Sequence, residues 1–167
     1  MATCQILEMS IETATVAPNT DICIDVTVGN GFLDVIAINW SLNWDASVLT
    51  FTGVDNFNPN LPGLNNSSIN QTDPDALIFS WFDFSGNDLP AGAVLYELCF
   101  TATENPGNCS AITFSNTPSN IEIGIDDSPT PTQVGFDGTD GSICIDGATI
   151  GLNFTQDSVS CPTETDG

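Results

Sequence analysis

The sequence predicts an all-β protein that folds as a two-layer sandwich of about nine short strands. Three observations support this prediction. Several segments alternate apolar and polar residues with a period of two, the pattern of a strand with one buried face. Short runs rich in Gly, Pro, Asn and Asp separate these segments and are typical of turns. No segment has the period of an amphipathic helix. At 167 residues the chain is long enough for one domain with a full core.

The clearest alternation begins at Asp34 and predicts a central pair of strands that ends at Val54. Large apolar residues at every second position are expected to face the core, and the small or polar residues between them to face outward. A turn at 45–47 leads into the second strand, which buries Leu49 and Phe51. The inward residues of the first strand are Ile36, Ile38, Trp40, Leu42 and Trp44, and the outward residues are Val35, Ala37, Asn39, Ser41 and Asn43.

Seven further segments complete the predicted sandwich. Residues 76–84 are apolar at nearly every position, which fits a strand covered on both faces or a strand whose outer face meets a partner. The stretches 55–74 and 126–141 are rich in turn residues and are expected to be irregular, with at most one short strand in the first. The seven predicted strands are 4–9, 21–28, 76–84, 93–103, 109–115, 121–125 and 142–146.

The charge balance excludes several classes of function. The chain has 22 acidic residues and no Lys, Arg or His, for a net charge of −22. It therefore lacks the side chains of a Ser-His-Asp triad, a Schiff-base lysine or a phosphate-binding lysine, and we do not expect an enzyme. Nucleic acid is excluded as a partner because no basic side chain is present to neutralise phosphate. Cations are the natural small partners of such a surface. No apolar run is long enough for membrane insertion, and the N-terminus does not resemble a signal peptide.

Six cysteines indicate an oxidising, extracellular compartment. Their number is even and their spacing is wide, and without His or a CxxC pair a zinc site is not expected. Cys23 and Cys99 both face outward on predicted strands, so a disulfide between them would join these strands if they are neighbours. The alternative is that some cysteines are free buried thiols. The remaining expected pairs are Cys4–Cys144 and Cys109–Cys161.

Four pieces of the sequence form a series of motifs. SLNWDASVLTFTGV at 41–54 has an aromatic-Asp pair followed by Ser-Val-Leu, and ALIFSWFD, LPAGAVLYELCFTAT and CSAITFSNTPSNIEI follow it. In this combination and order the pieces resemble the cohesin family. The similarity spans residues 5–146 and extends to cohesin-like repeats of large secreted surface proteins of Bacteroidota-type bacteria. It implies a nine-stranded jelly-roll sandwich, related to an immunoglobulin-like sandwich and to carbohydrate-binding modules. We expect residues 1–147 to form this domain and 148–167 a C-terminal extension.

The resemblance also implies a binding face. Cohesins of cellulosomes bind dockerins through their third, fifth and sixth strands. The complete loss of basic residues, the six cysteines and the extension depart from the family's pattern. Carried over by strand, the face would include Asn39, Ser41, Asn43, Ile78, Ser80 and Phe82.

Three other features are candidate sites. Asp137 and Asp140 in a Gly-rich stretch are candidate calcium ligands, although a solvated turn has the same composition. Ser158, in Asp-Ser-Val, resembles an O-glycosylation site of secreted Bacteroidota proteins, and its alternative is a linker serine. Trp81, Phe82 and Phe84 could form an aromatic platform for sugar rings, but we interpret them as core residues.

The leading functional hypothesis is a non-catalytic structural or adhesive module, a subunit or repeat of a cell-surface fibre. Ile150, Leu152 and Phe154 alternate in the extension and would let it add a strand to a neighbouring copy, or fold back on its own sandwich. The alternative function is a module that binds a protein or a polysaccharide, and a carboxylate-only hydrolase is the third hypothesis.

Overall fold

The computed structural model describes residues 5–147 and forms a β-sandwich, as the sequence predicts. It contains more strands than the nine expected, together with a short 3-10 turn at Asn66–Ser68. The twelve strands are β1 (Ile6–Ile11), β2 (Thr13–Val16), β3 (Asp21–Val28), β4 (Val35–Asn43), β5 (Leu49–Asp55), β6 (Ile69–Asp73), β7 (Ala76–Asn87), β8 (Val94–Ala102), β9 (Cys109–Ser115), β10 (Glu122–Ile125), β11 (Thr132–Thr139) and β12 (Gly141–Ile145).

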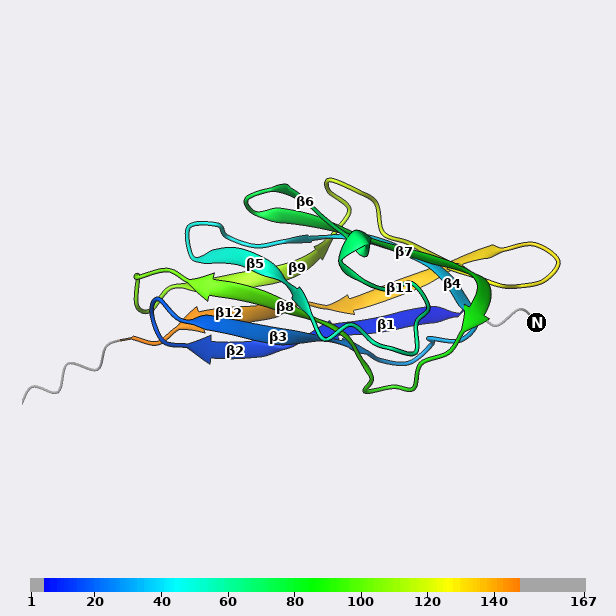
Figure 1. Cartoon of the computed structure of the whole chain (residues 1–167), viewed down its shortest axis with the longest axis horizontal. Helices are drawn as coiled ribbons and strands as arrows, with labels where there is room; N and C mark the ends of the chain where they lie inside the picture. Colours follow the sequence, from blue (N-terminus) through cyan, green and yellow to red (C-terminus); the bar gives the residue numbers. More distant parts are fainter. Residues whose placement is uncertain (1–4, 148–167) are drawn as a thin grey trace, which may run out of the picture.

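Two layers of strands pack against each other (Figure 1). One layer places β10, β4, β7 and β6 side by side, and the other places β1, β3, β8 and β5 in that order. β11 pairs with β10 and with β1, so it joins the two layers along one edge. At the other half of the molecule, β9 pairs with β4 and continues through β12 to β2. The apolar side chains of both layers form one core between them.

Strand β4 is the central element, because it pairs with three other strands. β7 lies along one edge, while β10 and β9 share the other edge. The predicted inward positions are correct from Ile38 to Trp44, and Trp40 is fully buried. It is wrong at the start of the strand, where Val35 is fully buried and Ile36 is only half-buried. The pairing with β7 shifts register between Val35 and Ala37, and this irregularity breaks the period of two.

The centre of the core is an aromatic cluster around Trp40. The Trp40 ring stacks on Phe79 at 5.0 Å between centroids and meets Phe114 edge-on at 5.3 Å. Its Nε1 donates a hydrogen bond of 3.1 Å to the hydroxyl of Tyr96 on the opposite layer. Tyr96 is fully buried, and this burial raises the pKa of its hydroxyl, although the bond from Trp40 opposes the shift. One indole therefore ties the two layers together through both ring packing and a buried hydrogen bond.

Two strands were missed because their sequences look like loops. β2 is only four residues long and follows β1 after Glu12, where the chain leaves the β3 layer to pair with β12. β11 lies in a stretch expected to be irregular because of its glycines and acids. Gly138 packs against aromatic rings there, and a Cβ would come within 2.6 Å of both Phe114 and Phe136. A glycine is therefore needed at this position for close packing, and not for a turn. β6 is the one short strand allowed for in 55–74.

Two disulfides join directly opposite residues of neighbouring strands. Cys23 and Cys99 are paired across β3 and β8, as their outward phase predicts. Cys109 is paired with Cys144 across β9 and β12. The expected pairs Cys4–Cys144 and Cys109–Cys161 are therefore wrong, because the register of β9 and β12 already places Cys109 opposite Cys144. Cys4 and Cys161 themselves lie outside the described residues.

Replacing the central indole should strongly destabilise the fold. We expect Trp40→Ala to lower the free energy of unfolding by ~3–5 kcal/mol, because it leaves a large cavity and an unpaired Tyr96 hydroxyl. Phe84→Ala is the matched control, since Phe84 is 91% exposed, and should change the stability by less than about 0.5 kcal/mol. Denaturant unfolding measures both. A loss below about 1 kcal/mol for Trp40→Ala would contradict the two-layer role of this residue.

Candidate functional site

The outer surface of β10, β4 and β7 forms one continuous face of small, polar and aromatic side chains. The strand registers place Asn39 directly between Glu122 and Ser80, and Ala37 between Gly124 and Phe82. These residues alternate with buried side chains of the same strands, so they point away from the core. We call this surface the outer face, and define it by Ala37, Asn39, Ile78, Ser80, Phe82, Glu122 and Gly124.

The face matches only part of the binding surface that the family resemblance implies. Ser41 lies opposite Ile78 but is completely buried, because residues 116–121 fold over it. Its hydroxyl donates to the Ser119 carbonyl at 2.9 Å and accepts from the Ser119 amide at 2.8 Å. Asn39 Nδ2 donates to the Ser119 hydroxyl and to the Asn120 carbonyl. Ser41 therefore cannot contact a partner, which corrects the expectation from the sequence. Asn43 and Ile78 are half-buried, whereas Ser80 and Phe82 are exposed.

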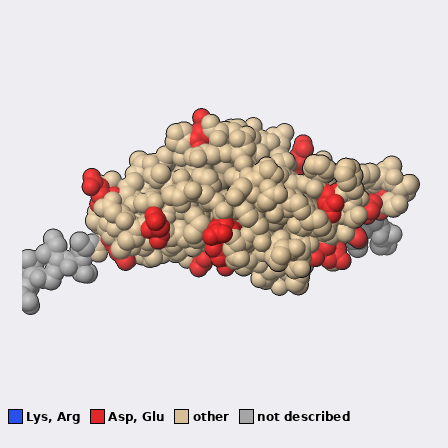
Figure 2. Space-filling model, viewed as in Figure 1, with Lys and Arg blue, Asp and Glu red and all other residues tan. Residues whose placement is uncertain are grey.

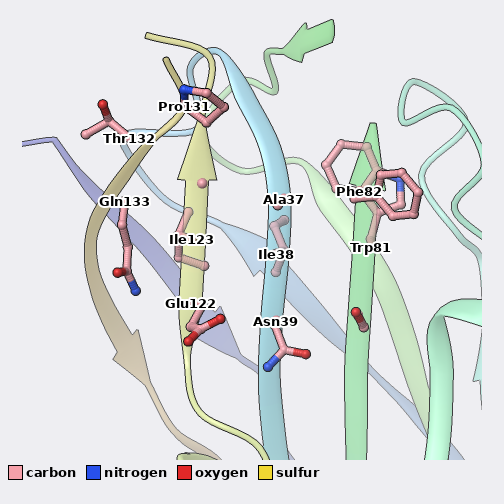
Figure 3. A pocket seen from close by; sticks show the side chains of 12 residues that line it. Ala37, Ile38, Asn39, Trp81, Phe82, Glu122, Ile123, Pro131, Thr132 and Gln133 are labelled. Atoms are coloured by element: carbon pink, nitrogen blue, oxygen red, sulfur yellow. The ribbon is translucent and has the colours of Figure 1, made fainter. Parts of the chain in front are cut away.

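A pocket of about 360 Å³ opens at the centre of the outer face (Figure 3). Ala37 and Gly124 form its floor, because neither carries a side chain large enough to fill the space. Phe82 forms one wall, and Pro131 with Gln133 forms the opposite wall. Glu122 is the one charged residue that lines this pocket. Sequence analysis missed the second wall, because residues 126–141 were expected to be irregular and not a strand beside β10.

Two aromatic residues stand out from the end of β7. Phe82 is 68% exposed and Phe84 is 91% exposed, and their rings meet edge to face at 5.6 Å. Val35 of β4 pairs with Asn87 of β7, and Ala37 pairs with Phe82. The chain therefore takes two steps along β4 but five along β7 between these pairs, so β7 bulges outward here. Trp81 is buried as expected, but the interpretation of Phe82 and Phe84 as core residues is wrong.

Side-chain hydrogen bonds hold the bulge in shape. Asp83 accepts a bond from the Phe84 amide and another from the Asn87 side chain. Asn87 also donates to the carbonyl of Ser85.

The nearly continuous apolar composition of β7 belongs to a strand that is covered on one face and open on the other. The first of the two explanations, a strand covered on both faces, is therefore wrong, because Ser80 and Phe82 are exposed.

Asp137 and Asp140, the candidate calcium ligands, do not belong to a cluster of acids in the part of the chain that the structure describes. Asp140 Oδ1 accepts the Phe114 amide at 2.9 Å, and Asp137 lies opposite Glu8 in the pairing of β11 with β1. Within residues 5–147, no group of three or more His, Cys, Asp or Glu side chains is placed to hold a metal ion.

In the same range no helix is long and apolar enough to cross a membrane. Ser158 and the alternating residues Ile150, Leu152 and Phe154 lie outside the described residues.

Comparison with solved structures identifies the fold. The seventh ScaB type I cohesin of Pseudobacteroides cellulosolvens matches with a TM-score of 0.73, covering 98% of this chain and 99% of that chain at 12% identity. The chain has the cohesin fold. The sixth cohesin of scaffoldin B from Acetivibrio cellulolyticus, solved in complex with a Cel5 dockerin variant, matches with a TM-score of 0.68 over 84% and 99% of the two chains at 19% identity. No protein-family model matches the sequence, and no curated protein matches it.

The cohesin fold also occurs outside cellulosomes. A non-cellulosomal cohesin from the hyperthermophilic archaeon Archaeoglobus fulgidus matches with a TM-score of 0.64, covering 83% of this chain and 90% of that chain at 20% identity. The jelly-roll architecture that the sequence resemblance implied is therefore confirmed. The identities are low, so the shared architecture does not by itself establish a function.

The opposite side of the cohesin sandwich carries a row of acids. Asp25, Glu97 and Asp55 lie directly opposite one another on β3, β8 and β5, and Glu12 Oε2 accepts the Asp25 amide. Partial burial and then the charges of Glu12 and Glu97 raise the pKa of Asp25 above its ordinary value of 3.8. The visible surface in Figure 2 shows acids spread over the molecule with no basic residue among them.

Neutralising Asp25 should stabilise the protein in a pH-dependent way. Its carboxyl binds a proton more readily in the folded than in the unfolded state, so it reduces stability as the pH rises through its folded pKa. We expect Asp25→Asn to raise the free energy of unfolding by about 0.2–1 kcal/mol at neutral pH, because like charges across strands are unfavourable. The gain should disappear below the ordinary pKa of 3.8, where the carboxyl is protonated in both states.

Denaturant unfolding at both pH values measures the effect. Asp75→Asn is a matched control, because Asp75 is exposed between β6 and β7 and lies outside the acidic row. An equal gain for the two variants at neutral pH would mean that total charge, and not the row, is responsible.

Proposed function

We propose that the chain is a non-catalytic, extracellular protein-binding module that takes a dockerin-like partner on its outer face. The observation that carries this proposal is the open face itself, where Phe82 and Phe84 are solvent-exposed beside a preformed pocket. Exposed aromatic residues next to a concave apolar site are typical of protein interfaces. The cohesin of scaffoldin B that shares this fold was solved with a dockerin bound, which supports a protein partner.

The chemistry of the face favours binding over catalysis. Its pocket is lined by one carboxylate, Glu122, whereas glycoside hydrolysis by carboxylates alone requires a pair across the scissile bond. The whole chain has no His, Lys or Arg that could act as a nucleophile activator or electrophilic group. We therefore place the carboxylate-only hydrolase behind the binding function.

The disulfides support the extracellular location. Both cystines join adjacent strands at the surface, where Cys23 and Cys109 are exposed. Such bonds persist in oxidising environments and are rare in the reducing cytosol. A domain without internal salt bridges gains from them a covalent restraint on its unfolded state.

A bulky side chain at the middle of the outer face should block the partner. Ser80 is exposed on β7 between Ile78 and Phe82, so Ser80→Tyr should weaken binding about a hundredfold by steric exclusion. Thr50→Tyr is the matched control, because Thr50 is exposed on β5 of the other layer, and should change the affinity less than about twofold. Calorimetric titration with a panel of calcium-loaded dockerin modules measures the affinities.

Three outcomes would change this assignment. A Ser80→Tyr variant that binds as tightly as Thr50→Tyr would place the interface elsewhere on the sandwich. A panel in which no dockerin binds contradicts the dockerin-like partner. Binding to polysaccharides on a glycan array, lost in Ser80→Tyr, would support the carbohydrate-binding alternative on the same face.

We also propose a fibre subunit as a second function, for which the arrangement of strand edges and chain ends provides the support. Within residues 5–147, β5 pairs only with β8 and β6 only with β7, so each leaves one edge open to another strand. The described chain starts before β1 at one end of the long axis and ends after β12 at the other end (Figure 1). A strand donated from the 148–167 extension to a neighbour's open edge would therefore build a head-to-tail filament.

Deleting residues 148–167 tests the fibre proposal. We expect the truncated chain to remain a folded monomer, because residues 5–147 contain their own core, and to lose any filament formed by the full chain. Electron microscopy and light scattering detect the filament, and circular dichroism checks the fold. Filaments that persist after the deletion, or a full chain that stays monomeric at all concentrations, would contradict donation by the extension.

A further inference from the structure

We infer that the pocket of the outer face receives a lysine or arginine side chain of the protein partner. This inference rests on the proposed protein-binding function and specifies the chemistry of the residue that the partner must present. It follows from three features of the pocket, namely its apolar walls, its single carboxylate and the acceptor groups at its rim.

The walls suit the aliphatic stem of a basic side chain. Ala37 lies between the ring of Phe82 and Pro131 (Figure 3), and Gly124 pairs with Ala37 on β10, so the floor between these walls carries only small residues. Lysine and arginine bury such stems along apolar surfaces while their charged ends stay near polar groups. The exposed Phe82 ring also offers a cation–π contact to a charge that lies over its face.

The single carboxylate of the pocket, that of Glu122, favours a cationic group of the partner. Glu122 is exposed at its lower rim, and no hydrogen bond engages its carboxylate within the described residues. No Lys, Arg or His of this chain can neutralise it, because the sequence contains none. Any basic side chain that pairs with Glu122 must therefore come from outside the chain, and an apolar side chain of the partner would leave the carboxylate unpaired at the interface.

The rim adds an acceptor beside this carboxylate. Asn39 lies directly across from Glu122, and its Nδ2 is already committed to Ser119 and Asn120. Its Oδ1 accepts no hydrogen bond among the described residues and points toward β7 in Figure 3. A guanidinium or ammonium group supplies several donors, which suits the carboxylate on β10 together with an amide oxygen on β4.

The outer-face pocket combines a carboxylate with an aromatic wall, and the acidic row lies apart from it on the opposite layer. Asp25 and Glu97 also lack a basic partner, but neither of them lines the pocket of the outer face or the hollow beside Trp44 and Cys109. General attraction to the −22 surface would act on a basic peptide at either place. The experiment must therefore separate a local pair from overall charge.

Selection of a random displayed dodecapeptide library on the full chain provides the ligands. Peptides that bind the outer face compete with one another and are blocked by Ser80→Tyr. We expect these peptides to share one lysine or arginine. Replacing that residue by norleucine should weaken binding about tenfold, and Glu122→Gln should weaken the original peptide by a similar factor. The two changes combined should cost no more than either alone, which is the mark of a direct pair.

Two matched variants control for charge and shape. Glu104→Gln removes the same charge from the exposed turn between β8 and β9, and should weaken the peptide less than about twofold. Phe82→Ala removes one wall of the pocket and should weaken binding of the basic peptide. The norleucine peptide should not bind this variant more tightly than the basic peptide does. Circular dichroism confirms that each variant is folded.

The results distinguish this inference from the function on which it rests. Peptides that are blocked by Ser80→Tyr but carry no required basic residue would overturn the lysine or arginine pocket and leave the protein-binding function standing. Equal effects of Glu122→Gln and Glu104→Gln, or additive losses in the double change, would also overturn it. A library and a dockerin panel that both yield no binder would remove the protein-binding function itself.

Discussion

The absence of every cationic side chain is the constraint on which the rest of the structure depends. Without salt bridges between side chains, residues 5–147 are held by one aromatic core, by strand pairing and by two cystines. Surface carboxylates find hydrogen-bond donors instead of charges. Asp45 accepts both the hydroxyl and the amide of Ser47, and these bonds lower the pKa of its carboxyl. Carboxylates that find no such donor remain available to a partner.

Strand β4 connects this core to the proposed binding surface. Its inward side chains place Trp40 between the layers, where ring packing and the bond to Tyr96 fix the strand's position. The same strand presents Ala37 and Asn39 outward, in register with Phe82 on one side and Glu122 on the other. The rigidity of the core therefore sets the distances across the outer face, which preorganises it for binding.

Local alternation was enough to predict the layers but not the surface they present. The period of two located Trp40, Leu42 and Cys23–Cys99 because each depends on neighbouring positions in one strand. The burial of Ser41 depends on a loop almost eighty residues away in sequence, and no local pattern reports it. Gly138 was interpreted as a turn residue, although the rings of Phe114 and Phe136 require a glycine there. The second wall of the pocket was missed for that reason.

Carboxyl labelling by carbodiimide tests the central claim most directly, because the many acids of this chain report on both layers at once. The chain is labelled alone and when saturated with a dockerin module that binds it, and each acid is then quantified by mass spectrometry. Binding on the outer face predicts that Glu122 becomes protected while Glu12, Asp25 and Glu97 keep their reactivity. Protection of the acidic row with Glu122 still reactive would contradict the assignment of the outer face as the binding surface.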